Sequence, residues 1–597
     1  MEQRERLAAL RAEMKLQGVD IYLIPTADFH NSEYVGEYFK VRRYITGFTG
    51  SAGTAVVTAD KAGLWTDGRY FIQAAAELEG SGFELYRMGV EGVPTIGEFI
   101  GQNLPQHGVL GFDGRTVDAA QADKLRAVVE KKQGTLSVTE DLAGKIWTER
   151  PPMSCTRTWI LKEEYSGESA ASKIGRIREA MREAGAGYHL ISSLCDNAWI
   201  LNLRADDISH VPVFLSFLLI GEADVRLYIQ EEALDDEVRA YLGNCGVEIR
   251  PYGEIYGALA ELPSGTALLA DKKQVSCRAI SSLQPGVTVI DRENPSERMK
   301  AVKNPTELAN TRRAHQKDGV AMTKFMYWLK TNVGRIPMTE YTAQEMLDGL
   351  RAEQEHFLDL SFGDICACGP NAAMMHYSAD PETAAQILPE GMLLVDSGGH
   401  YLEGTTDITR TFVLGPVTPQ MKLHYTTVVR CNMALANLKF LYGCAGTSLD
   451  VICRAPLWEM GIDYRCGTGH GVGHILNVHE GPNGFRYRIV PERKDSGVLE
   501  PGMITTDEPG VYLEGEYGIR TENELICVED EKNEYGQFLR FENITYCPID
   551  LDGIDPELMT QKEKKQLNEY HKRVYETVSP FLTEEEREWL KIYTREV

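Results

Sequence analysis

The sequence predicts a mixed α/β (α+β) protein of several domains, in which two similar α/β segments precede a larger domain of helices and strands. A helical stretch runs into an apolar strand twice, as RAEMKLQGVD–IYLIP around Arg11 and as REAMREAGAG–YHLISSL around Arg178, and turn signals and further strands follow each. After about residue 300, long helical stretches come first and strands follow. A chain of 597 residues, 43% hydrophobic and 25% charged, has room for about two to four domains.

Two breaks divide the chain. Pro151 and Pro152 interrupt any regular element in ERPPMSCTRT, which is the first expected linker. The second expected linker is DRENPSER. We therefore expect domains at residues 1–152, 153–297 and 298–597.

Local signals place the helices of this chain. The N-terminal stretch MEQRERLAALRAEM is expected to be an amphipathic helix and not a signal peptide. In the third domain Asn304 and Pro305 are typical of an N-cap and a first helical residue. Helices are expected in ANTRRAHQKDGVAMTKFMYWLK, in TAQEMLDGLRAEQEHF and in the Lys- and Glu-rich C-terminal stretch.

Composition narrows the class of partner. The formal net charge is −26, which argues against nucleic acid or anionic membrane as the main partner. The longest apolar run, around residues 211–220, is too short to cross a bilayer. Twelve cysteines without a CxxC pair indicate free thiols in a reducing cytoplasm. Cys366 and Cys368 are better explained as same-face residues of a core strand than as metal ligands.

Two aspartates lie beside predicted strands of the third domain. Asp396 ends the buried-strand pattern LLV, and Asp407 precedes the alternating residues ITRTF. Two strands with a Gly-rich connection indicate a hairpin, which could bring the carboxylates together. Taken alone, the pair is explained at least as well by turn aspartates flanking a loop.

The segment GTGHGVGHILNVHEGP favours a functional site over the interpretation of the two aspartates as turn residues. It holds His470, His474 and His479, and its glycines allow the backbone to approach a ligand closely. A lone histidine is usually structural, but three in such a setting favour a site. Glu508 in TTDEPG and Glu522 in GIRTENE are each typical of turns or strand edges when taken singly.

Together these side chains form a hard, oxygen-rich ligand set. The two aspartates, the two glutamates and His470 suit Mn(II), Co(II), Fe(II) or Zn(II) better than a thiolate zinc site does. Their four negative charges would be balanced by two divalent ions. A pair of bridged ions can generate a hydroxide nucleophile at neutral pH.

The motifs resemble those of the M24 metallopeptidases. The order MMHY, VDSGGHY, GTGHGVGHILNVHEGP, TTDEPGVY and GIRTENE is similar to that family, and more narrowly to its long, three-domain aminopeptidase P type. FTGSAGTAVVT, LWTDGRYFIQA and NLRADDISHVPVFLSF are similar to the creatinase-type N-terminal domains of the same type. The resemblance covers essentially the whole chain. It implies a C-terminal pita-bread domain, whose curved antiparallel sheet holds two metals, preceded by two creatinase-type α/β domains.

The resemblance implies a role for each ligand. Asp407 and Glu522 would bridge two divalent ions, His470 and Glu508 would complete one site, and Asp396 would complete the other. Manganese(II) is the expected ion, with Co(II), Zn(II) and Fe(II) as alternatives.

Further roles follow position by position. His376 and His479 match positions that contact substrate, and Arg69 matches a peptide-binding arginine of the N-terminal domain. Arg520 and Tyr512 would orient carboxylates from outside the ligand set. Many relatives have a histidine four residues before the ligand histidine, where this chain has Cys466, so the contact made there is in doubt.

The implied activity is release of the N-terminal residue from peptides with proline in second position. A metal-bound hydroxide would attack, and Glu508 would shuttle the proton. The resemblance also suggests a homodimer. Prolidase, which takes dipeptides and usually has one N-terminal domain, and methionine aminopeptidase remain alternatives. A silent peptide-binding module and metal-free creatinase-like hydrolysis are disfavoured, because all five ligand types are present.

Overall fold

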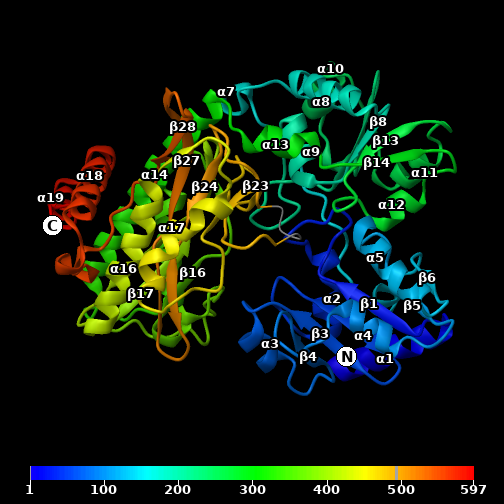
Figure 1. Cartoon of the computed structure of the whole chain (residues 1–597), viewed down its shortest axis with the longest axis horizontal. Helices are drawn as coiled ribbons and strands as arrows, with labels where there is room; N and C mark the ends of the chain where they lie inside the picture. Colours follow the sequence, from blue (N-terminus) through cyan, green and yellow to red (C-terminus); the bar gives the residue numbers. More distant parts are fainter. Residues whose placement is uncertain (1, 491–494) are drawn as a thin grey trace. The chain divides into compact units, whose positions relative to one another are not determined.

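The computed structural model describes residues 2–490 and 495–597 (Figure 1). The chain forms two compact units. Unit 1 comprises the residues up to Ile160 together with Glu168–Ser296, and unit 2 comprises Leu161–Gly167 and Glu297–Val597. No helix among the described residues is long and apolar enough to cross a membrane.

Unit 1 contains two six-stranded sheets with one topology. The first has the order β4-β3-β2-β1-β5-β6, with strands at Glu84–Arg87, Ala62–Thr66, Thr54–Thr58, Ile21–Pro25, Val109–Gly111 and Thr135–Ser137. The second has the order β12-β11-β10-β8-β13-β14, with strands at Val247–Pro251, Val225–Ile229, Ser216–Gly221, Tyr188–Ile191, Ala267–Ala270 and Thr288–Asp291. In each sheet the third strand is antiparallel to both neighbours, and all other pairs are parallel. The predicted repetition of one layout is confirmed.

The helix before each sheet's fourth strand is also repeated. Helix α1 spans Gln3–Leu16 and precedes β1, and helix α8 spans Ala170–Ala184 and precedes β8. Each buries one stripe with successive spacings of three and four residues, made of Leu7, Leu10 and Met14 in α1 and of Ile174, Ile177 and Met181 in α8. The predicted N-terminal helix is confirmed from Gln3 onward; Met1 lies outside the described residues.

The two expected linkers differ. Residues 149–158 form no helix or strand apart from the turn at their start, and the chain there is fixed by Asp207, which accepts hydrogen bonds from Ser154 Oγ (2.7 Å) and the Thr156 amide (2.8 Å). The segment 291–298 is not an open linker, because helix α13 begins within it at Pro295 and runs to Ala301. Proline has no amide hydrogen to leave unpaired in a first helical turn, so Pro295 opens a helix.

Unit 2 opens with the two predicted helices. Helix α14 spans Pro305–Asn332, and the Asn304 side chain accepts from the amides of Thr306 and Glu307, so the predicted cap is confirmed. Helix α15 spans Glu340–Ala352 and ends before the expected 357. His356 has φ +64° and Phe357 pairs with Tyr401 as the first residue of a strand, so the chain has turned out of the helix by then.

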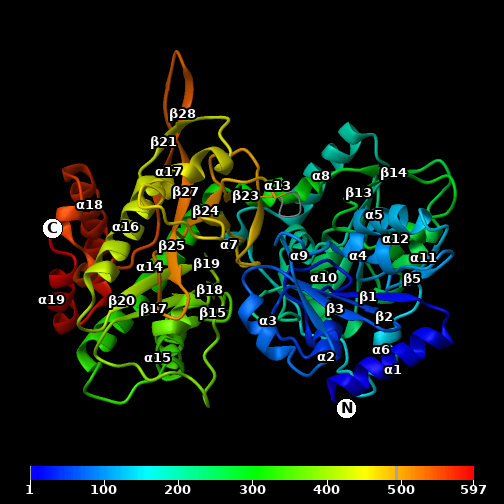
Figure 2. The same cartoon turned by 60° about the horizontal axis from the view of Figure 1, so that its bottom comes forward.

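The strands of unit 2 form mainly antiparallel sheets. The order β16-β17-β20 joins Ile365–Cys368, Met392–Ser397 and Ile408–Val413, and the order β21-β28-β27-β24-β22-β23 joins Lys439–Leu441, Gly536–Asn543, Asn523–Asn533, Ile504–Asp507, Gly469–Gly471 and Glu480–Phe485. Strands β27 and β28 form a long hairpin that projects beyond its neighbours (Figure 2). Helices α14, α16 (Pro419–Ala436) and α17 (Gly446–Trp458) lie along these strands, and α18 (Gln561–Val578) and α19 (Glu584–Tyr593) close the chain (Figures 1 and 2).

The predicted hairpin around the two aspartates is largely confirmed. Strands β17 and β20 are antiparallel neighbours, and Asp396 lies opposite Thr409. The connection is not a simple loop, since it contains the short strands β18 (Gly399–Tyr401) and β19 (Gly404–Thr405). The turn into β18 requires glycine at 398, because a Cβ there would lie 1.9 Å from the Thr406 carbonyl oxygen.

Cys366 and Cys368 lie on β16, opposite Val395 and Leu393, with Cys366 fully buried. The core-strand interpretation of this pair is therefore confirmed. All twelve cysteines are free thiols.

Candidate metal centre

Three of the predicted ligands converge in unit 2. One ligand atom each of Asp407, His470 and Glu522 lies within 4.8 Å of the other two. His470 Nε2 is 3.4 Å from Asp407 Oδ2. Asp407 immediately precedes β20, His470 is the middle residue of β22, and Glu522 lies between β26 (Tyr517–Arg520) and β27. Strand ends from distant stretches of the chain thus meet at one point.

Glu508 and Asp396 lie at the margins of this cluster. Glu508 follows β24, its amide donates to the Thr468 carbonyl (2.7 Å), and its Oε1 is 3.9 Å from His470 Nε2. Asp396 lies in β17, and its carboxylate accepts a hydrogen bond from Arg520 Nη2. The structure therefore brings all five predicted ligands into one neighbourhood, three of them within reach of a single ion.

Carboxylates lie close together in a largely buried position in this cluster, and this affects the pKa values of Asp407 and Glu522. Burial, followed by the nearby charges of Asp396 and Glu508, raises the pKa of Asp407 well above its ordinary value. Burial, followed by Asp407 and Glu508, likewise raises the pKa of Glu522. Fully ionised, these carboxylates repel one another and Arg520 contacts them through Asp396 alone, so a divalent ion would relieve much of the remaining cost.

We expect the metal-free protein to lose stability as pH rises above about 4, the ordinary carboxyl pKa. The raised pKa values of Asp407 and Glu522 mean that the folded state binds more protons than the unfolded state above that pH. The loss is expected to grow with pH until the two carboxyl groups ionise in the folded state as well. Thermal melts of chelator-treated and manganese-loaded protein across this range test it. A metal-free melting curve that does not change with pH would contradict it.

Two carboxylate oxygens of the cluster are suited to cation binding. Asp396 Oδ1 and Asp407 Oδ1 are buried and have no hydrogen-bond donor among the residues that the structure describes. Buried carboxylate oxygens nearly always have a partner, so a metal ion is the simplest partner here. The donor set of four carboxylates and one imidazole fits two divalent ions of the Mn(II) type.

Arg520 and Tyr512 lie behind the carboxylates. Arg520 Nη1 donates to the Tyr512 hydroxyl (2.7 Å), and Arg520 Nε donates to Thr409 Oγ1 (3.1 Å). Thr409 Oγ1 in turn donates to Glu522 Oε2 at 2.7 Å. The Arg520 guanidinium group therefore contacts Asp396 directly and is connected to Glu522 through the Thr409 hydroxyl group.

Thr409 was not predicted from the sequence. The signal was present, because Asp407, Thr409 and Thr411 alternate and therefore share one face of β20. Thr411 Oγ1 completes the pattern by donating to the Arg520 carbonyl (2.9 Å).

The histidines occupy different settings. The His479 ring packs edge-on against the His470 ring, with centroids 4.3 Å apart. His376 is exposed just after the short helix η4 (Gly369–Ala373). His474 is buried and lies 3.3 Å from Thr311 Oγ1 through Nδ1, which ties this loop to α14.

The strand that follows His479 is anchored by a buried ion triad that the sequence did not reveal. Glu480 forms ion pairs with Lys303 and with Lys300 (3.3 Å), and all three side chains are at most 6% exposed. Because the carboxylate is held from two sides, Glu480 fixes the start of β23 and with it the position of His479.

Two further predicted residues lie outside the cluster. Arg69 belongs to unit 1, where its guanidinium group makes a bidentate pair with Asp67, with both distances 2.8 Å. Cys466 is half-buried in the loop before β22, and burial, followed by the nearby Glu508 carboxylate, raises the pKa of its thiol to about 12. A thiol of that pKa is neutral at physiological pH.

Comparisons with known proteins agree with this geometry. Residues 309–529 match metallopeptidase family M24, residues 537–597 match the C-terminal region of that family, and residues 6–144 and 149–307 each match the creatinase/prolidase N-terminal domain. A protein of Coprinopsis cinerea named "Probable Xaa-Pro aminopeptidase P" is 38% identical over 98% of this chain and 97% of its own length.

The chain belongs to the M24 metallopeptidase family.

Other relatives are consistent with that assignment. Aminopeptidase P1 of Arabidopsis thaliana is 35% identical over 99% of both chains. The crystal structure of an X-prolyl aminopeptidase of Caenorhabditis elegans, described as a cytosolic enzyme with a di-nuclear active site, has a TM-score of 0.94, 31% identity and full coverage of both chains. This M24 metallopeptidase therefore has the pita-bread domain and the two creatinase-type domains that its sequence predicts.

Proposed function

We propose that this protein is a metal-dependent aminopeptidase that releases the N-terminal residue from Xaa-Pro-Yaa peptides. The observation that carries the proposal is the convergence of Asp407, His470 and Glu522 within 4.8 Å, in a chain whose relatives along its full length are named for this activity. Asp407 and Glu522 are the proposed bridging ligands. His470 and Glu508 complete one site, and Asp396 completes the other.

Asp396, Asp407, His470, Glu508 and Glu522 would hold two divalent ions, Mn(II) in our proposal, which would supply Lewis acidity and acidify a water molecule. The residues of the chain perform the remaining tasks. Glu508 is half-buried and its Oε1 is 3.9 Å from His470 Nε2. It is our proposed proton shuttle, which would take the proton of the attacking water and pass it to the leaving nitrogen. Arg520 and Thr409 hold Asp396 and Glu522 in fixed orientations, so the ligands need no rearrangement during turnover.

His376 and His479 are the proposed donors to the carbonyl oxygen of the scissile bond. Preorganised donors of this kind typically contribute about 3–4 kcal/mol each to the transition state. An X-Pro bond has no N–H, so the site must recognise the proline ring by shape. Arg69 is proposed to contact the peptide from the N-terminal domain.

Peptide specificity tests the proposal. We expect manganese-reconstituted protein to release arginine from Arg-Pro-Pro with at least about tenfold higher kcat/KM than from Arg-Ala-Pro, because only the first fits a proline pocket. Chromatography of the released amino acid gives the rates. Preference for the dipeptide Arg-Pro would favour prolidase, and preference for Met-Ala-Pro would favour methionine aminopeptidase.

The proposal also covers the domain division, the cellular location and the partners of the protein. The domain division at 1–152, 153–297 and 298–597 is supported by the two sheets of equal topology. A cytoplasmic location is supported by the free cysteines and by the description of the Caenorhabditis elegans enzyme as cytosolic. We also propose a homodimer, which light scattering would test. Neither nucleic acid nor membrane is a proposed partner.

A further inference from the structure

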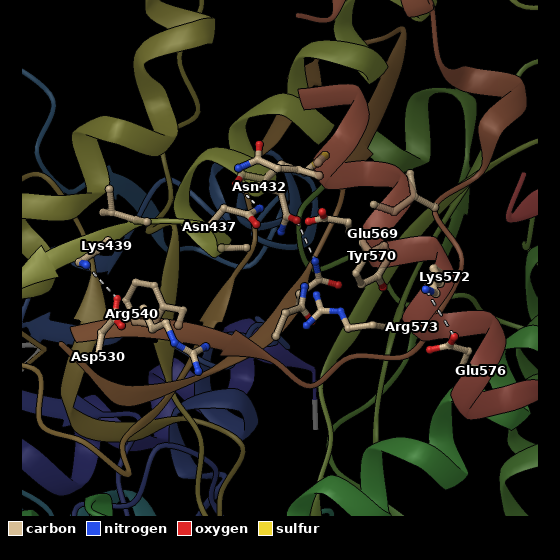
Figure 3. A pocket seen from close by; sticks show the side chains of 18 residues that line it. Asn432, Asn437, Lys439, Asp530, Arg540, Glu569, Tyr570, Lys572, Arg573 and Glu576 are labelled. Atoms are coloured by element: carbon tan, nitrogen blue, oxygen red, sulfur yellow. Dashed lines mark hydrogen bonds and ion pairs between the residues drawn. The ribbon is translucent and has the colours of Figure 1, made fainter. Parts of the chain in front are cut away.

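A pocket of about 540 Å³ opens on unit 2 away from the ligand cluster, between α16, α18 and the β27–β28 hairpin (Figure 3). None of the proposed metal ligands or substrate contacts lines it. Its volume is in the range of sites for small molecules. Its floor consists of the buried polar side chains of Asn432, Asn523 and Tyr570.

Two arginines that line the pocket make no direct ion pair, although the Glu542 carboxylate, which Arg312 binds, is near both of them. The lysines there are engaged, since Lys439 pairs with Asp530 (3.2 Å) and Lys572 pairs with Glu576 (3.9 Å). Arg540 and Arg573, in contrast, make no ion pair or hydrogen bond within the described part of the chain. Figure 3 shows both side chains extending over the pocket, Arg540 from β28 and Arg573 from α18.

Two unpaired guanidinium groups over one pocket are unusual in a chain of net charge −26. Guanidinium groups pair with carboxylates and phosphates through parallel hydrogen bonds. Three carboxylates also line the pocket, but each already pairs with a lysine: Asp530 with Lys439, Glu569 with Lys565 and Glu576 with Lys572. The two arginines are therefore the charges available to a ligand, and they match an anion.

The floor of this pocket is hydrogen-bonded to the backbone of the metal centre. Asn432 Nδ2 donates to the carbonyl of Asp507 (2.7 Å), the residue before a proposed ligand, and Asn523 Nδ2 donates to Asn432 Oδ1 (2.7 Å). Arg410 joins the other side, because its Nη2 donates to Asn523 Oδ1 (2.8 Å) and its Nη1 donates to the Glu522 carbonyl (2.6 Å). A molecule on the floor would thus act on strand ends that carry two ligands.

We propose that this pocket binds a small organic anion with two or more carboxylate or phosphate groups, held by Arg540 and Arg573, and that its occupancy changes turnover at the metal centre. The binding itself does not depend on which peptides the metal centre cleaves. The protein would then have two sites, the metal centre and this pocket, connected through the hydrogen bonds of Asn432 and Asn523.

Calorimetric titration of the metal-loaded full chain with tricarballylate, and separately with sulfate, tests the binding at constant ionic strength and free metal. We expect saturable binding of tricarballylate that is weakened by about tenfold or more in Arg540→Met and in Arg573→Met, since each loses a charge-assisted contact. Lys562→Met is the matched control, because Lys562 is exposed on the same helix and does not line the pocket. Its affinity should equal that of the wild type.

Two results would overturn the proposal. One is the absence of saturable binding by either anion, and the other is unchanged affinity in the Arg540→Met/Arg573→Met double variant with a wild-type melting temperature. The coupling is read from kcat and KM for a peptide at saturating tricarballylate. A change that disappears in the double variant supports the coupling, and identical kinetic constants with and without the anion refute it. Failure of peptide specificity alone leaves the calorimetric result untouched.

Discussion

Asp407→Asn is expected to abolish peptide hydrolysis in protein supplied with excess manganese. Asp407 is buried, lies 3.4 Å from His470 Nε2, and belongs to the three-residue cluster that can hold an ion. The amide offers one neutral oxygen in place of two charged ones, so it cannot bridge two cations. Mutation of residues that merely support metal ligands typically costs about 10–100-fold, so we expect loss of a bridging ligand to exceed about 1000-fold in kcat/KM.

Asp555→Asn is the matched control for this substitution. Asp555 is not among the proposed ligands or substrate contacts. Its side chain accepts a hydrogen bond from the Glu557 amide (3.1 Å), and an asparagine side chain can accept the same bond. Both variants should melt close to the wild type when loaded with metal. Near-normal turnover by Asp407→Asn in folded, metal-saturated protein would show that the cluster is not the catalytic centre.

Arg351→Met is expected to cause a large loss of stability in unit 2. Arg351 is fully buried on α15, donates to Asp318 of α14 through Nε (2.6 Å) and Nη2 (3.3 Å), and lies 3.6 Å from Asp364. Removing the cation leaves two buried carboxylates without a counter-charge. Breaking a buried pair in this way typically costs about 3–5 kcal/mol, which urea unfolding can measure.

Arg312→Met provides the comparison. Arg312 lies on α14, the helix that carries Asp318, and makes a bidentate pair with Glu542, with both distances 2.7 Å. About one third of each of these two side chains is exposed. Exposed pairs typically contribute about 0–1 kcal/mol. Equal losses in the two variants would mean that the burial of Arg351 does not determine its contribution.

Local chemistry explains what could be predicted from the sequence. The Asn304 cap depends on a side chain and two amides that follow it directly, and the neighbouring strands around Asp396 and Asp407 are joined by one short connection. The glycine pattern around His470 is likewise visible in one segment. Each of these features involves residues that are near one another in the chain, so their spacing carries the information.

Features that depend on distant partners could not be predicted in this way. Lys303 and Glu480 meet across 177 positions, and Thr409 and Glu522 across 113. Nothing near Glu480 in the sequence indicates that its carboxylate is buried between two lysines. The end of α15 was also mispredicted, because the left-handed turn at His356 is imposed by the pairing of Phe357 with Tyr401.

The central claim is that side chains from four separate segments hold a pair of cations in unit 2. Anomalous diffraction from crystals of manganese-loaded protein, collected at the manganese edge, tests this claim most directly. We predict two peaks per chain, bounded by Asp396, Asp407, His470, Glu508 and Glu522. A map without peaks there, or with manganese bound only elsewhere, would contradict the account.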